Sequence, residues 1–197
     1  MTSENKKLVL LYKRTLKNDH FLQCTKTITS ELVVTDSSRF ETLVNTRREN
    51  FGEPLINNDG TVLMTRNFER NKRYGSDSLT LLYRKPGEPA FKEQNIVLTS
   101  HYIQNPVLKI DQLNARYLIN AYASTASTGD ADGIFTALLD SQMRIITSNY
   151  NELSPDIRKS IQSSGRNTED APELNSRNII LKKNNGFILI AEESYTE

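Results

Sequence analysis

A turn that runs into an apolar strand occurs more than once in this 197-residue sequence, and it constrains the fold more than any other feature. The clearest copy spans residues 57–65, where Asn-Asn-Asp-Gly precedes Thr-Val-Leu-Met-Thr. Asn, Asp and Gly tolerate the positive φ angles that a tight hairpin turn needs. Further versions occur at 114–120 and 184–190, and one without its turn at 7–12. The pattern predicts an all-β chain.

The spacing of these copies suggests a repeat. One leucine marks each copy, and the four leucines are separated by 55, 55 and 71 residues: Leu8, Leu63, Leu118 and Leu189. Residues 76–83 also resemble 131–138, which places Asp77 and Asp132 another 55 residues apart. Units of this size are typical of β-propeller blades.

The longer third interval contains the segment with the clearest helix signals, near 154–163. Ser154 suits the N-cap and Pro155 the first helical position. Ile157 and Ile161 recur at helical spacing, so we expect them to pack on a sheet. If the repeat is real, Leu63, Leu118 and Leu189 occupy equivalent buried positions.

The predicted architecture is one β-propeller-like domain over residues 1–197, with three units and part of a fourth. Their boundaries lie near 1–57, 58–113, 114–183 and 184–197. A propeller needs about four to eight blades to close, and an apolar edge strand is rarely left bare. We therefore expect a fragment of a longer propeller, a homodimer that joins through the exposed C-terminal strand edge, or an open array of units.

Composition narrows the functional classes. The chain has 25 Lys and Arg, 24 Asp and Glu, and a net charge of +1, which disfavours a general electrostatic surface for nucleic acid or an anionic membrane. Cys24 is the single cysteine, so an internal disulfide and a Cys-rich zinc site are excluded, and we expect this side chain to be buried in its strand. The chain has no tryptophan and two histidines, His20 and His101. We predict no cofactor and no metal site.

The sequence leaves the cellular compartment open. No apolar run reaches the length of a transmembrane helix. The first residues lack the apolar core of a secretory signal. An exported bacterial protein is expected if a leader has been removed.

Asp77 and Asp132 are the candidate catalytic residues, because they occupy the same position of the repeat. Two carboxylates near a propeller axis would serve as general acid and base, or would bind a cation. The structural interpretation is that each aspartate accepts backbone N–H bonds in the turn before its strand. A recurring position favours the structural interpretation, since a structural need recurs with every unit.

Two loops carry the candidate ligand-binding residues. The stretch 66–74 combines basic and aromatic side chains that would suit a phosphate and a base: Arg66, Phe68, Arg70, Lys72, Arg73 and Tyr74. The alternative is a solvated loop that Glu69 and Asp77 balance. The loop around Asp130 resembles a calcium-binding loop, but Leu139 stands where the bidentate carboxylate is required.

Four segments resemble uncharacterised bacterial β-propeller-like proteins: 58–60, 77–81, 109–114 and 183–192. The resemblance covers most of 55–197 and rests on structural motifs. It implies a propeller scaffold, often in exported proteins, with no established activity and no functional residues to carry over.

These observations predict a non-enzymatic binding or scaffold module. Its loops at 69–76, 124–132 and 164–177 would hold a protein, peptide or glycan partner. The alternative is a propeller-type glycoside hydrolase that uses Asp77 and Asp132. A third hypothesis is a nucleic-acid-binding protein that uses 66–74.

Overall fold

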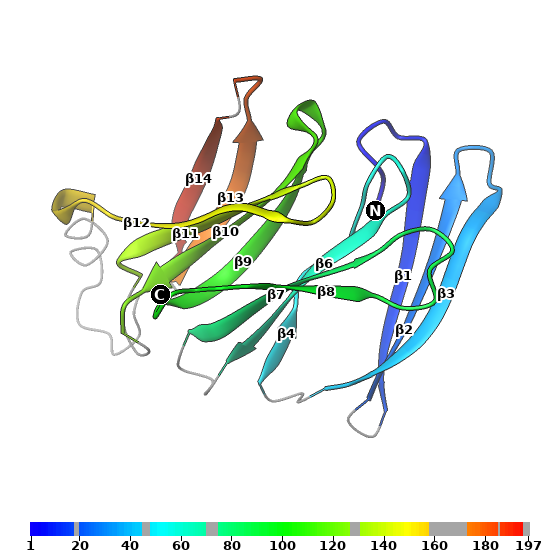
Figure 1. The fold of residues 1–197 in the computed structure, drawn as a ribbon, viewed down its shortest axis with the longest axis horizontal. Helices are drawn as coiled ribbons and strands as arrows, with labels where there is room; N and C mark the ends of the chain where they lie inside the picture. The colour runs from blue at the N-terminus through cyan, green and yellow to red at the C-terminus, as the bar shows by residue number, and fades with distance from the viewer. Residues whose placement is uncertain are drawn as a thin grey trace. The chain divides into compact units, whose positions relative to one another are not determined.

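The computed structural model describes residues 1–17, 20–44, 48–69, 75–126, 131–157, 173–184 and 186–194 (Figure 1). The chain forms two compact units. Unit 1 contains Met1–Phe68 and Leu79–Asn95, and unit 2 contains Glu69–Ser78 and Ile96–Glu197.

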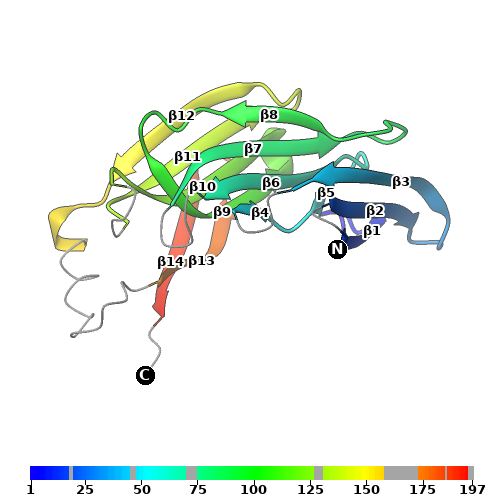
Figure 2. The same cartoon turned by 90° about the horizontal axis from the view of Figure 1, so that it is seen from below.

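Unit 1 begins with a three-stranded antiparallel sheet, whose strands Figure 2 shows side by side. The strands follow each other in the order β1 (Leu8–Lys17), β2 (His20–Thr29) and β3 (Val34–Leu43). Side chains alternate between the two faces of each strand. Leu10, Gln23, Thr25 and Thr27 lie buried on the inner face, and the outer face is largely exposed.

The other strands of unit 1 centre on β6, which lies between β4 and β7 and also pairs with β5, while β8 pairs with β7. Their bounds are β4 (Glu49–Phe51), β5 (Leu55–Ile56), β6 (Val62–Glu69), β7 (Ser76–Arg84) and β8 (Lys92–Ile96). Val62, Leu63 and Met64 are completely buried, as their unbroken apolar run predicts.

The turn that precedes β6 is the one the sequence predicts. The Gly60 amide donates to the Asn57 carbonyl over 3.0 Å, and the Asn57 amide donates to the Thr61 carbonyl over 2.8 Å. The Asp59 carboxylate accepts from the Thr61 amide over 2.8 Å. Gly60 has φ +87°, a value that few other residues adopt without strain.

Unit 2 contains an antiparallel meander with strand order β9-β10-β11-β12, a short 3-10 helix η1 and the hairpin β13-β14. The bounds are β9 (Tyr102–Asp111), η1 (Gln112–Asn114), β10 (Arg116–Ser124), β11 (Gly133–Asp140), β12 (Ile145–Glu152), β13 (Glu173–Leu181) and β14 (Phe187–Ser194). All nine residues of β10 are buried between β9 and β11. The start of β7 also belongs to this unit, where Ser76 pairs with Ile103.

The all-β prediction is confirmed, and the sheets are antiparallel, but the propeller-like repeat is not confirmed. Every sheet among the described residues is an open path of strands. The turn of the second copy also differs from that of the first, because Asp111 caps η1 and Ala115 takes a left-handed conformation. Leu63 and Leu118 are fully buried, whereas Leu189 is half-buried.

The predicted helix begins where expected. Pro155–Ile157 is helical, and the Ser154 hydroxyl accepts a hydrogen bond from the Ile157 amide over 3.3 Å, which confirms the N-cap. The predicted packing of Ile157 on a sheet is wrong, because its side chain is 49% exposed. A short apolar stripe indicates a helix but does not determine what covers it. Ile161 lies outside the described residues.

No helix within the described ranges is both long enough and apolar enough to span a membrane.

Candidate functional site

The outer face of β1, β2 and β3 carries the candidate site, which we name the basic depression. It is a surface concavity of about 450 Å³. The residues that line it come from all three strands: Leu11, Tyr12, Lys13, Cys24, Thr25, Lys26, Ser37, Ser38 and Arg39. None of them is a carboxylate.

Strand register brings the three cations of the basic depression together. Lys13 lies opposite Cys24, and Cys24 lies opposite Arg39, so these residues form one row across the sheet. Lys26 lies in the neighbouring row, between Leu11 and Ser37. Neighbouring strands are about 4.8 Å apart, so the Cα atoms of Lys13 and Arg39 are roughly 10 Å apart. Long, flexible side chains at this spacing can converge on one ligand that carries several negative charges.

Nearly all charged residues on this face are basic. By strand alternation, Lys17 also belongs to the outer face, and Glu41 is its one acidic residue in β1–β3. The side chains of Lys13, Lys26 and Arg39 are exposed and make no ion pair with the described part of the chain. Leu11 adds an apolar side chain that is 52% exposed. The face therefore offers positive charge beside apolar surface.

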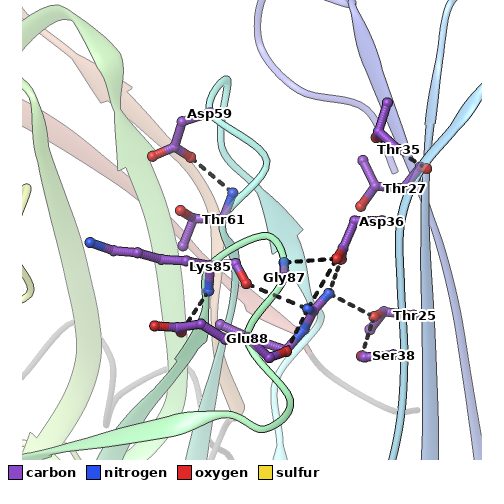
Figure 3. Close-up of polar contacts among 11 residues, drawn as sticks. Thr25, Thr27, Thr35, Asp36, Ser38, Asp59, Thr61, Lys85, Gly87 and Glu88 are labelled. Carbon is purple, nitrogen blue, oxygen red and sulfur yellow. Dashed lines mark hydrogen bonds and ion pairs between the residues drawn. The ribbon is translucent and has the colours of Figure 1, made fainter.

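A buried ion pair fixes the inner face of the same sheet (Figure 3). The guanidinium of Arg84 is fully buried and pairs with Asp36 of β3. It also donates to the Thr25 hydroxyl over 3.1 Å and to the Glu88 carbonyl over 3.0 Å. The Gly87 amide donates to Asp36 over 3.0 Å. These bonds fasten β2 and β3 to the turn after β7, so the basic depression lies on a braced sheet.

The charge of Asp36 is stabilised at neutral pH. The hydrogen bond from Arg84 lowers the pKa of Asp36 below its usual range, and the Gly87 amide acts in the same direction. Burial of the carboxyl opposes this effect without overcoming it. Asp36 and Arg84 therefore neutralise each other within the inner face, and Asp36 does not offset the cations of the outer face.

Asp132 lies directly before β11. Its carboxylate accepts from the Thr125 amide over 3.1 Å, from the Thr125 hydroxyl over 2.8 Å and from the Tyr150 hydroxyl over 2.7 Å. Burial alone would raise the pKa of Asp132, but the bonds from Tyr150 and Thr125 outweigh it and lower that pKa. The Tyr150 ring stacks on His101 with centroids 4.1 Å apart. Asp77 is exposed near the start of β7.

The other candidate residues lie mostly outside the described ranges: Arg70, Lys72, Arg73, Tyr74 and Asp130. At the start of the basic stretch, Arg66 pairs with Glu49 at 2.7 Å and with Glu93 at 3.3 Å. The charge of Arg66 is therefore matched within unit 1, as expected for a structural side chain.

Sequence reasoning missed the basic depression. Lys13, Lys26 and Arg39 lie on three separate strands, and only the register of the strand pairs places them together. The expectation that Cys24 is buried is wrong, because its residue is half-buried and lines the depression. The available signal was the alternation of polar and apolar residues along the three strands. That alternation shows which residues of one strand share a face, but not which residues of neighbouring strands lie opposite each other.

Comparisons with protein families, with curated proteins and with solved structures give no match. Among the described residues, no group of three or more His, Cys, Asp or Glu side chains is arranged to hold a metal ion.

Proposed function

We propose that this protein is a non-enzymatic binding module whose basic depression holds an acidic, partly apolar segment of another protein. The observation that carries the proposal is the row formed by Lys13, Cys24 and Arg39, with Lys26 beside it, on an exposed face that has almost no acidic residues.

Charge supports an acidic ligand. The three cations lie within reach of one another, and side-chain carboxylates are the matching groups that a polypeptide offers. Arg39 can bind a carboxylate with two parallel N–H bonds, while Lys13 and Lys26 act as point charges. The surrounding sheet is braced from the inner face, so little ordering of the protein is needed when the ligand binds.

Apolar surface supports a polypeptide over a nucleic acid. Leu11 is half exposed between the cations, and it would contact an apolar side chain of the ligand. The net charge of +1 lacks the broad positive field on which binding to a polyanion depends. Arg66, the described cation of the basic stretch, is engaged by Glu49 and Glu93. No observation on the described residues favours the glycoside hydrolase hypothesis.

The experiment measures how a fluorescein-labelled peptide of Glu-Glu-Leu repeats binds, by fluorescence anisotropy. Because an exposed charge pair is worth up to about 1 kcal/mol, the double variant Lys13→Glu with Lys26→Glu should weaken binding by about tenfold or more. The control reverses the same number of charges in unit 2, with Lys109→Glu and Lys182→Glu, and should leave the affinity unchanged.

Labelling of Cys24 provides a second measure of peptide binding. Because Cys24 is the only cysteine in the chain, no cysteine has to be introduced or removed. Bound peptide should slow the reaction of Cys24 with a maleimide. Equal affinities for the two double variants, or an unchanged labelling rate at saturating peptide, would show that the basic depression is not the binding site.

A further inference from the structure

Strand β3 forms an unpartnered edge of the three-stranded sheet. It spans the ten residues Val34–Leu43, of which all but Thr35, at a register shift, pair with β2 on one side, and no other strand of the described residues pairs with them. Val34 is 50% exposed and Leu43 is 68% exposed. At the opposite edge, β1 is partly covered, because Thr2 bridges to Val9. A long edge strand with free backbone groups is a template for pairing with another strand.

The sequence of β3 is complementary to itself when two copies run antiparallel about Phe40. In that register, Arg39 of each copy lies opposite Glu41 of the other, and Ser38 lies opposite Thr42. Opposite charges and paired hydroxyls stabilise neighbouring strands when they face each other directly.

The neighbouring registers are unfavourable. When the two-fold axis of the dimer is perpendicular to the sheet, outer-face residues of one copy lie opposite outer-face residues of the other. Because side chains alternate between the two faces, the axis must then pass through a residue of β3 and not between two residues. A centre at Arg39 places two arginines opposite each other, and a centre at Glu41 places two glutamates together. Among the centres at Arg39, Phe40 and Glu41, only Phe40 brings opposite charges together.

Side-chain directions also fit the register about Phe40. Arg39 and Glu41 are exposed on the outer face, where their charged groups are free to meet. Phe40 points to the inner face, where its ring packs against Phe91 with centroids 4.8 Å apart. The two Phe40 side chains would then lie beside each other near the two-fold axis, where aromatic pairs are favourable.

We propose that two copies of this chain associate through β3 to form one continuous six-stranded antiparallel sheet. The interface shares Arg39 with the basic depression, but its formation does not depend on a bound ligand. Pairing about Phe40 satisfies the free backbone groups between Ser37 and Leu43 and places the exposed Leu43 opposite Ser37 of the second copy. Lys13 and Lys26, on β1 and β2, stay away from the interface.

The first test is a charge swap followed by sedimentation velocity over a range of concentrations, to separate a dimer from the 22.4 kDa chain. Arg39→Glu and Glu41→Arg, each alone, place like charges opposite each other and should raise the dimer Kd at least tenfold. The double variant with both changes restores the opposite charges and should return the Kd to within about threefold of the natural value. Lys17→Glu, on the same face but away from β3 and outside the basic depression, is the control and should have no effect.

The second test measures the distance between spin labels on the two copies of Cys24. Three strand spacings of about 4.8 Å and an offset of two residues place the two Cα atoms roughly 16 Å apart. Double electron–electron resonance should therefore give distances between the two spin labels of about 15–30 Å.

Two results would overturn the proposal. One is a chain that stays monomeric at concentrations of about 100 µM. The other is a dimer that is insensitive to both single charge changes and has Cys24 labels more than 40 Å apart, as expected for association through the C-terminal strand edge. Rescue by the double variant is the outcome that a purely structural role of either residue would not produce.

Discussion

Arg84 is a fully buried arginine in a small β-rich unit, and its charge is matched by one carboxylate. A buried charge is tolerated when it is paired and hydrogen-bonded. Asp36 supplies the opposite charge, and Thr25 and the Glu88 carbonyl accept further bonds from the guanidinium. Removal of Asp36 would leave Arg84 with a buried charge and no counter-ion.

We therefore expect Asp36→Asn to lower the free energy of unfolding by about 3 kcal/mol at neutral pH, as found when one partner of a buried pair is removed. The effect depends on pH. Because Arg84 lowers the pKa of Asp36, the stabilisation is complete above the usual pKa of about 3.9 and is lost as the pH falls below it. The difference between the variant and the natural protein should therefore shrink in acid. Urea titrations at several pH values measure both effects.

The matched control is Arg144→Gln, which removes one partner of the ion pair between Arg144 and Asp140. The Arg144 side chain is 76% exposed, so solvent screens its pair with Asp140 and removal of the pair should have little effect on stability. A loss for Asp36→Asn no larger than that for Arg144→Gln would contradict the role assigned to the buried pair.

At the scale of elements, two turns of unit 1 depend on glycines in left-handed conformations. Gly60 has φ +87° in the turn before β6, and Gly87 has φ +77° in the turn after β7. Their surroundings differ. A Cβ on Gly60 would lie 2.9 Å from Pro86, whereas a Cβ on Gly87 would have no neighbour within 4 Å.

Alanine substitutions at these two glycines distinguish the cost of backbone strain from the cost of steric overlap. Gly87→Ala should cost about 1 kcal/mol, from the left-handed conformation alone. Gly60→Ala should cost about 2–3 kcal/mol, because overlap with Pro86 adds to the same strain. Chemical unfolding of the two variants in parallel measures the difference. Equal losses would mean that the turn moves away from Pro86 without cost.

At the scale of the whole molecule, neither compact unit is a continuous piece of the chain. Unit 2 takes in residues 69–78, which precede part of unit 1 in the sequence. Within unit 2, Ser76 pairs with Ile103, and both residues are completely buried. A cut between residues 95 and 96 would separate this pair.

We expect a fragment of residues 96–197 to unfold at a lower urea concentration than a fragment of residues 69–197, because the shorter fragment lacks Ser76, which pairs with Ile103. Circular dichroism during the titration measures the midpoints. Addition of a 1–95 fragment should raise the midpoint of 96–197. Identical midpoints for the two unit 2 fragments would show that residues 69–78 do not stabilise this unit.

Local sequence determined the features that depend on neighbours along the chain. The Asn-Asn-Asp-Gly segment forms its predicted turn because Asp59 and Gly60 make hydrogen bonds to residues of the same turn. Ser154 caps the start of its helix through a bond to a residue three positions later. The apolar runs around Leu63 and Leu118 lie in buried strands. These features were sufficient to predict the all-β class and the positions of several strands.

Tertiary structure decided which strands pair and in which register, and the candidate site depends on both. Arg84 and Asp36 are 48 residues apart, and nothing near either residue in the sequence indicates its partner. Lys13, Cys24 and Arg39 form one row only because β1, β2 and β3 pair in one register, and a shift by a single residue would move their side chains to the other face. Similar local segments also ended in different surroundings, which is why regular spacing of leucines did not establish a repeating unit. Strand propensity is local, whereas the choice of partner strands depends on how the whole chain buries its apolar surface.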